Sequence, residues 1–271
     1  MKFFAIRDET EPSQKDLAYL LYYETPKRFY IELPENPDPW DTPLLLSSFA
    51  KNGVKSVNSY WSQLWVQQRI VPSDRQNLGQ ILKDNQLKTY DEYELLMLGM
   101  GRCAQDDYYL VPISENDLPK KVVKRFEKRI EDIVPLSDYT LLVFFRDGMV
   151  RRIDLADYFS SRPRFQVLLL HPELFRHVRI QTAGYGIQWD ETLSISDREL
   201  YGIGKRIPLS MDDFKSFVKE RVVNASEAAE LLNCSRQYIN ELVKADKLHP
   251  IKASEKNTLF LKSEVLQRGW Q

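Results

Sequence analysis

Residues 222–248, VVNASEAAELLNCSRQYINELVKADKL, decide the fold of the C-terminal part of this chain. Ser226 precedes a run rich in alanine and leucine, and Ser235 precedes a second run whose apolar residues recur at the spacing of one helical face. Serine is a favoured N-cap because its hydroxyl accepts a hydrogen bond from an otherwise unpaired amide of the first turn. The stretch therefore predicts two short helices joined by a turn around Asn233, a residue that tolerates left-handed backbone.

The second of these helices is predicted to present a polar face to solvent. Its inward residues are Ile239, Leu242 and Val243. In the major groove, arginine pairs with guanine, whereas glutamine and asparagine pair with adenine. Two short helices, the second carrying such side chains, form the helix-turn-helix plan. The candidate DNA-binding residues are Ser235, Arg236, Gln237, Tyr238, Asn240, Lys244 and Lys256.

The residues after the second helix predict a small wing. Residues 252–257 form a polar turn, residues 258–261 return as a strand, and Ser263 is the expected N-cap of a last helix. The segment resembles the excisionase and MerR-like winged helix-turn-helix family, which implies DNA binding. The resemblance rests on Glu227, Ala228, Ala229, Leu231, Leu232, Ser235, Arg236, Tyr238, Ile239, Leu242, Leu248, Phe260, Ser263 and Val265.

The charge distribution limits how DNA could be bound. The chain has 38 Lys and Arg against 39 Asp and Glu, a formal net charge of −1. Residues 1–119 carry −6, residues 120–221 carry +4 and residues 222–271 carry only +1. Because phosphate neutralisation supplies most of the non-specific affinity, the last segment alone would bind weakly. We therefore expect a homo-oligomer or a contribution from the basic middle part.

The middle of the chain predicts a β-hairpin that follows a basic helix. Two β-rich runs flank Asp147 and Gly148, a dipeptide that suits a tight hairpin turn. The basic helix is expected over residues 120–133. Residues 134–204 resemble a small bacterial domain family of undefined function, often encoded beside toxin–antitoxin genes, which implies protein contact or regulation. The resemblance rests on Phe145, Asp147, Gly148, Asp154, Leu155, Phe175, Val178, Gly186, Ile187, Trp189, Asp190, Ile195, Asp197, Leu200 and Tyr201.

The N-terminal part predicts a hairpin over residues 17–33 and three short helices over residues 44–98. Residues 65–113 resemble the region that precedes the kinase in some bacterial HipA-like proteins. No phosphate-binding glycine loop or catalytic loop follows, so the resemblance implies a recognition module. It rests on Trp65, Arg69, Pro72, Arg75, Leu82, Leu87, Tyr90, Asp91, Gly101, Arg102, Asp106, Asp107 and Tyr109.

These patterns together predict an α+β multidomain protein with an N-terminal hairpin and helices, a central small α+β domain and a C-terminal winged helix-turn-helix. The expected parts are a mixed hairpin and helical domain over 1–119, a basic linker helix over 120–133, the small α+β domain over 134–219 and the winged helix-turn-helix over 220–271.

The same sequence argues against other classes of protein. Two cysteines cannot make a disulfide framework or a zinc site with four cysteine ligands, and having only three histidines further limits metal and acid–base chemistry. No apolar run approaches the ~20 residues of a membrane helix. We expect a cytoplasmic protein that is not an enzyme and needs no cofactor or metal. Its partners should be double-stranded DNA and either a second copy or another protein, not a membrane.

The predicted function is that of a sequence-specific DNA-binding protein. A transcriptional regulator, which could be an antitoxin-like autoregulator, fits the pattern best, and its N-terminal and central domains would bind proteins. An excisionase-like architectural recombination factor and a non-DNA protein-interaction module stay open as alternatives, because a fold does not fix a function.

Overall fold

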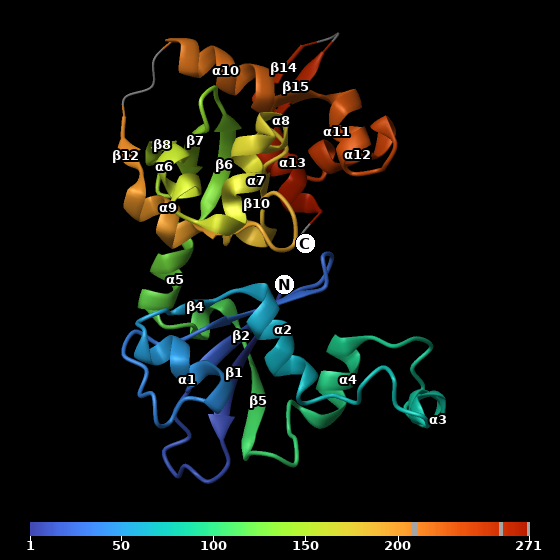
Figure 1. The fold of residues 1–271 in the computed structure, drawn as a ribbon. Coiled ribbons are helices and arrows are strands. Elements are labelled where there is room, and N and C mark those ends of the chain that lie inside the picture. Colours follow the sequence, from blue (N-terminus) through green and yellow to red (C-terminus); the bar gives the residue numbers. More distant parts are fainter. Residues whose placement is uncertain (208–210, 255–256, 270–271) are drawn as a thin grey trace. The chain divides into compact units, whose positions relative to one another are not determined.

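The computed structural model describes residues 1–207, 211–254 and 257–269 of the chain. Several separate sheets alternate with short helices, which confirms the predicted α+β multidomain class. The chain forms two compact units, Met1–Lys124 and Arg125–Gln271 (Figure 1). Each unit is described below by itself.

An antiparallel sheet forms the centre of the first unit. Its strands are β1 (Lys2–Asp8), β2 (Ala18–Tyr23), β3 (Arg28–Glu32), β4 (Ser56–Val57) and β5 (Tyr108–Ile113). They are ordered β4-β3-β2-β1-β5, so the short β4 and the later β5 lie at the two edges. The predicted hairpin is confirmed, since Tyr23 pairs with Arg28 across its turn. Every residue of β2 is buried, which explains its continuous apolar and aromatic sequence.

Residues 44–99, all of which the structure describes, form four helices where the sequence predicted three. They are α1 (Leu44–Lys51), α2 (Ser59–Gln67), α3 (Leu78–Asp84) and α4 (Glu92–Gly99). Gly53, at φ +65°, turns the chain between α1 and α2. The α2 helix is fixed on the sheet by Ser62, whose hydroxyl accepts a hydrogen bond from the Ile31 amide at 2.9 Å, and by Trp65, which is fully buried.

The basic helix predicted over 120–133 is shorter than expected. Helix α5 (Lys120–Phe126) ends early, and residues Ile130–Pro135 form strand β6. The apolar residues at helical spacing suited either structure. Pairing of Ile130 with Phe145 on the next strand decides the outcome, because it buries Ile130 in the core of the second unit.

Two sheets build the middle of the second unit. Its further strands are β7 (Thr140–Phe145), β8 (Val150–Asp154), β9 (Arg179–Ile180), β10 (Gly186–Gln188), β11 (Ser194–Ser196) and β12 (Lys205–Arg206). One sheet has the order β12-β8-β7-β6 and the other β11-β10-β9. The predicted hairpin between β7 and β8 is confirmed, with Gly148 at φ +78° in its turn.

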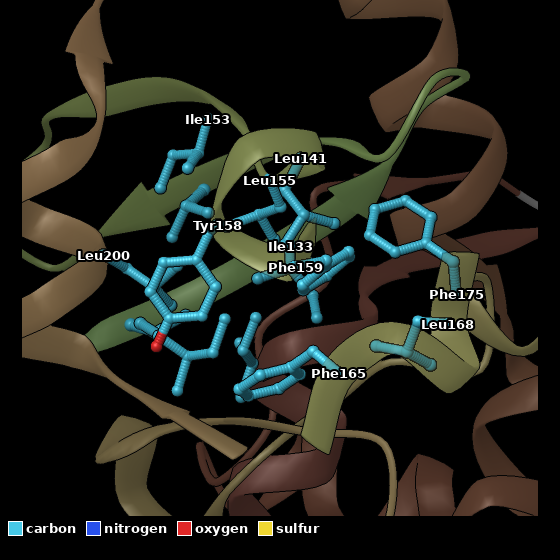
Figure 2. Packing of buried hydrophobic residues seen from close by; sticks show 14 of the residues in the cluster. Ile133, Leu141, Ile153, Leu155, Tyr158, Phe159, Phe165, Leu168, Phe175 and Leu200 are labelled. Atoms are coloured by element: carbon cyan, nitrogen blue, oxygen red, sulfur yellow. The ribbon is translucent and has the colours of Figure 1, made fainter. Parts of the chain in front are cut away.

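An aromatic core fills the space beneath these sheets. The helices that supply it are α6 (Ala156–Ser160), α7 (Gln166–Leu170), α8 (Pro172–Phe175) and α9 (Asp197–Ile203), together with the 3-10 turn η2 (Pro163–Phe165). Two further 3-10 turns are η1 (Glu115–Asp117), in the first unit, and η3 (Thr182–Gly184), in the second. Phe159 and Phe165, both labelled in Figure 2, stack with their ring centres 5.4 Å apart. Both side chains are fully buried, so this core makes the middle of the unit an independent apolar centre.

The C-terminal segment has its own small core. The elements of this segment are α10 (Met211–Arg221), β13 (Val222–Asn224), α11 (Ala225–Leu231), α12 (Arg236–Lys244), β14 (Lys252–Ala253), β15 (Thr258–Leu261) and α13 (Lys262–Arg268). The three strands have the order β13-β15-β14. Ile239, Phe260 and Val265 are completely buried in the cluster that joins α12, β15 and α13. The two helices, the returning strand and the last helix are thus present in the predicted order, but residues 252–253, which were predicted as part of a polar turn, form strand β14 because they pair with β15.

Candidate nucleic-acid interface

The first helix of the candidate interface is capped by Asn224. Its side chain accepts hydrogen bonds from the amides of Ser226 and Glu227 at 2.8 and 3.1 Å. The Glu227 carboxylate accepts one from the Asn224 amide at 2.7 Å, which completes a capping box. The prediction of Ser226 as the cap was therefore wrong. Asn224 has the extended backbone of a cap and already satisfies both amides, so Ser226 lies inside the helix.

The turn between α11 and α12 has the predicted geometry. Asn233 takes the left-handed conformation, with φ +49°, which Asn tolerates better than most residues. Ser235 then caps α12, and its hydroxyl accepts a hydrogen bond from the Tyr238 amide at 3.1 Å. The cap fixes where α12 begins and therefore which side chains share its outer face.

The α12 helix separates its apolar and polar residues clearly. Ile239 and Leu242 are buried, and Val243 packs partly against the same core. Six of the seven candidate residues lie in the part of the chain that the structure describes, and all six are exposed to solvent. They are Ser235, Arg236, Gln237, Tyr238, Asn240 and Lys244. The seventh, Lys256, lies outside the described residues. Side chains that can pair with base edges thus lie on one accessible helix.

The carboxylate of Glu241 reduces the positive potential of this face. Glu241 is exposed on the same helix, and Gln237 donates a hydrogen bond to its carboxylate at 3.3 Å. Gln237 must give up this bond before it can pair with a base. The two cations of α12 are Arg236 and Lys244, and both are exposed, so they are the residues of this helix that could bind a phosphate or a guanine.

Two backbone hydrogen bonds join the two sides of the wing. Ser254 donates its amide to the Asn257 carbonyl at 2.9 Å, and Ile251 donates its amide to the Leu259 carbonyl at the same distance. The sequence did not predict Lys252 as a DNA-binding residue, although it is exposed on β14. The feature of the sequence that could have identified it is its position as a lysine at the start of the predicted wing.

The last helix begins without the predicted serine cap. Leu261 is the N-cap of α13, and Ser263 is buried inside the first turn. The prediction of Ser263 as the cap was wrong because β15 runs directly into α13, so the helix starts two residues earlier than a serine cap would place it.

His249 connects the end of α12 to α13. Its Nδ1 lies 2.8 Å from Glu264 Oε1, and its backbone amide donates to the same oxygen at 2.8 Å. On the other side, its Nε2 lies 3.3 Å from Asp246 Oδ1. The hydrogen bond with Glu264, helped by the charges of both carboxylates, raises the pKa of His249 above its usual value.

The stability of this connection should therefore depend on pH. A raised pKa in the folded state means that protonation of His249 stabilises the fold. The contribution is complete below the usual pKa of about 6.5 and is lost as the pH rises through the folded value. We expect His249→Gln to remove the part of the stability that declines above about pH 6.5, as measured by urea unfolding across this range. The control is His177→Gln, which removes another exposed histidine. Identical pH profiles for the wild type and His249→Gln would contradict the prediction.

A buried ion pair joins the segment before the interface to the sheet of the middle domain. Arg221 at the end of α10 pairs with Asp132 of β6, and both side chains are almost fully buried. Burial lowers the pKa of Arg221 to about 10. Desolvation, assisted by the charge of Arg221, also lowers the pKa of Lys262 at the start of α13. Arg221 is buried and Lys262 is half-buried, so these two cations add little to a DNA-binding surface.

Asp106 and His171 contact other side chains of the protein. Asp106 binds Arg69 Nη2 at 2.5 Å, and His171 Nδ1 lies 3.2 Å from Glu173. Among the residues that the structure describes, no group of three or more potential ligands could hold a metal ion. Within the same residues, none of the helices has both the length and the apolar character needed to cross a membrane.

Comparisons with known proteins give a family for the middle domain. A crystal structure from Nitrosomonas europaea ATCC 19718, named "Putative DNA Binding Protein NE0471", is 23% identical; the similarity covers 45% of this chain and 79% of that chain, with a TM-score of 0.23. No curated protein is significantly similar to the chain. The family resemblances of the N-terminal and C-terminal parts stay predictions. Residues 130–206 match the family described as "Protein of unknown function (DUF2442)", which confirms the predicted similarity of the middle domain to a family of undefined function.

Proposed function

We propose that this protein binds double-stranded DNA sequence-specifically, with α12 as the recognition helix. The observation that carries the proposal is the division of α12 into a buried apolar face and an outer face with Arg236, Gln237 and Asn240. Such side chains form paired hydrogen bonds with guanine and adenine in the major groove. A transcriptional regulator is the function that fits this surface best, and no enzymatic activity is part of the proposal.

The remaining domains are proposed to serve protein interaction and assembly. Residues 222–271 carry a net charge of only +1, so one copy of the interface would neutralise few phosphates. A homo-oligomer would present two or more copies of α12 to one duplex and would multiply the contacts. An antitoxin-like protein that binds its own promoter is the finer form of this proposal.

Two observations support a protein-interaction module as the second candidate. Ile251, beside strand β15 of the wing, and Tyr238, on α12, are exposed to 51% and 48%. Large exposed apolar side chains suit a protein partner better than a phosphate backbone. If this candidate is right, a captured protein partner should bind equally well to Arg236→Ala and Lys244→Ala.

The test of DNA binding is a gel shift with genomic fragments that include the promoter of the gene itself. We expect a preferred fragment whose binding weakens as salt is raised. An excisionase-like architectural factor would in addition bend its fragment, which shows in a circular-permutation assay. If no fragment is preferred at any salt concentration, the proposal is wrong.

Arg236→Ala is expected to weaken binding to the preferred fragment by about 1–3 kcal/mol, because one paired base contact is lost. Binding to unrelated DNA should change much less, since a base contact carries sequence information that a phosphate contact does not. Fluorescence anisotropy with the two duplexes measures both affinities. Arg164→Ala, which removes an exposed arginine outside the interface, is the matched control. Equal affinities of Arg236→Ala and the control would refute the assignment of the recognition helix.

A further inference from the structure

Four cations meet at the edge of the sheet in the middle domain. Strand β12 is the edge strand beside β8, and its two residues pair directly with two arginines. Lys205 lies opposite Arg152, and Arg206 lies opposite Arg151. Directly opposed residues of an antiparallel pair share one face of the sheet, so each face carries two like charges side by side. Such pairs destabilise a sheet unless something neutralises them.

Three of the four cations are exposed, although the carboxylates of Asp212, Asp213 and Glu220 line the same cavity as Arg152. Arg152, Lys205 and Arg206 are exposed, and none of them forms an ion pair with a carboxylate in the part of the chain that the structure describes. Arg151 is held in place instead. Its Nη1 donates to the Gly204 carbonyl at 2.6 Å, and its guanidinium lies 4.1 Å from the centre of the Tyr201 ring.

The cationic character extends beyond the two strands. Lys128 lies 5.1 Å from the centre of the same Tyr201 ring, so this ring has two cations within cation–π distance. Tyr201 is fixed in turn, because its hydroxyl donates to Asp147 at 2.8 Å. The cations therefore lie on a rigid frame of sheet and helix.

The ligand suited to this edge is extended rather than small. A cavity of about 490 Å³ lies beside Arg152, but Asp212, Asp213 and Glu220 also line it, and these carboxylates disfavour a free anion inside. The open edge, by contrast, offers cations on both faces of the sheet. A chain of phosphate groups that runs along the strand can approach all of them.

We propose that the cations of β8 and β12 form a second contact site for the phosphate backbone of double-stranded DNA. The choice of DNA rests on the proposed function of α12. The site adds exposed cations to those of residues 222–271, which carry a net charge of only +1. It contributes affinity without sequence preference, because phosphate contacts carry no base information.

The experiment is the salt dependence of DNA binding by the full-length chain. The variant R152Q/K205Q/R206Q is compared with K120Q/K121Q/K124Q, a control that removes three exposed lysines of α5 and so changes the net charge equally. Each lost phosphate contact lowers the magnitude of the slope of log K, the DNA-binding constant, against log salt by about 0.9. The slope of R152Q/K205Q/R206Q should therefore be smaller than that of the wild type by about 2.7, and the slope of the control should be unchanged. The preference of R152Q/K205Q/R206Q for the selected fragment should equal that of the wild type.

The outcomes separate this site from the recognition helix. A wild type without sequence preference, combined with a reduced slope in R152Q/K205Q/R206Q, would overturn the recognition helix and support the edge site. A slope equal to that of the control would overturn the edge site, even if Arg236→Ala abolishes the preference. New dimers of the variant in light scattering, with an unchanged slope, would also overturn it, since the charges would then serve to block edge-to-edge strand pairing. The smaller variant K205Q/R206Q should lose about 1.8 of the slope, and thermal unfolding checks that both variants are folded.

Discussion

Ile239→Ala is expected to lower the stability of the C-terminal segment by about 2–5 kcal/mol, the cost of a cavity left by a large buried side chain. Ile239 is completely buried and packs with Phe260 and Val265 in a core of few residues. Little else is available there to fill the space. Hydrogen exchange of the amides between 222 and 254 measures the loss, because it reports this segment apart from the other domains. DNA binding should fall together with the protection of these amides.

The neighbouring residue provides the control for this experiment. Tyr238 is 48% exposed, so Tyr238→Ala should change the stability by no more than about 0.5 kcal/mol. It removes more atoms than Ile239→Ala but leaves no buried cavity. Equal loss of protection in the two variants would show that α12 does not pack through the face described above.

Arg129→Met is expected to destabilise the middle domain by about 3–5 kcal/mol, the usual cost of leaving one partner of a buried ion pair without the other. Arg129 Nη1 donates to Asp197 Oδ2 at 2.7 Å, and both residues are buried. The guanidinium also stacks on the Tyr185 ring at 3.5 Å from its centre. The substitution therefore removes the buried ion pair with Asp197 and a ring contact. Urea unfolding followed by near-ultraviolet circular dichroism measures the change through the aromatic core.

A double variant distinguishes the charge effect from lost packing. Arg129→Met combined with Asp197→Asn removes both charges, so it should recover part of the stability that Arg129→Met loses. If the double variant is as unstable as the sum of the two single variants, the two residues are not coupled and the ion pair contributes nothing.

Local signals in the sequence were sufficient for much of the C-terminal segment. The cap at Ser235, the left-handed Asn233 and the inward Ile239 follow from rules that involve residues close together in the chain, and the structure confirms all three. The hairpin turn at Gly148 was predictable for the same reason. The exposure of Arg236 followed directly from the helical spacing.

Local signals failed where two residues competed for one role or where a distant strand decided the outcome. Asn224 displaced Ser226 as a cap because its side chain could accept from both free amides. Residues 130–135 became a strand because the β7 strand was available to pair with them, and nothing within 120–133 indicates that partner. A helical period in a short apolar run is compatible with both structures until the partner is known.

The sequence by itself determined the α+β class of the fold, the presence of α11, the start of α12 and the polar composition of the α12 face. These depend on hydrogen bonds and side-chain spacing within a few residues, which the order of amino acids fixes. Only the tertiary structure decided that Lys205 and Arg206 lie opposite Arg152 and Arg151. These residues are more than fifty positions apart in the chain, and their proximity depends on the register of two strands that no local pattern specifies.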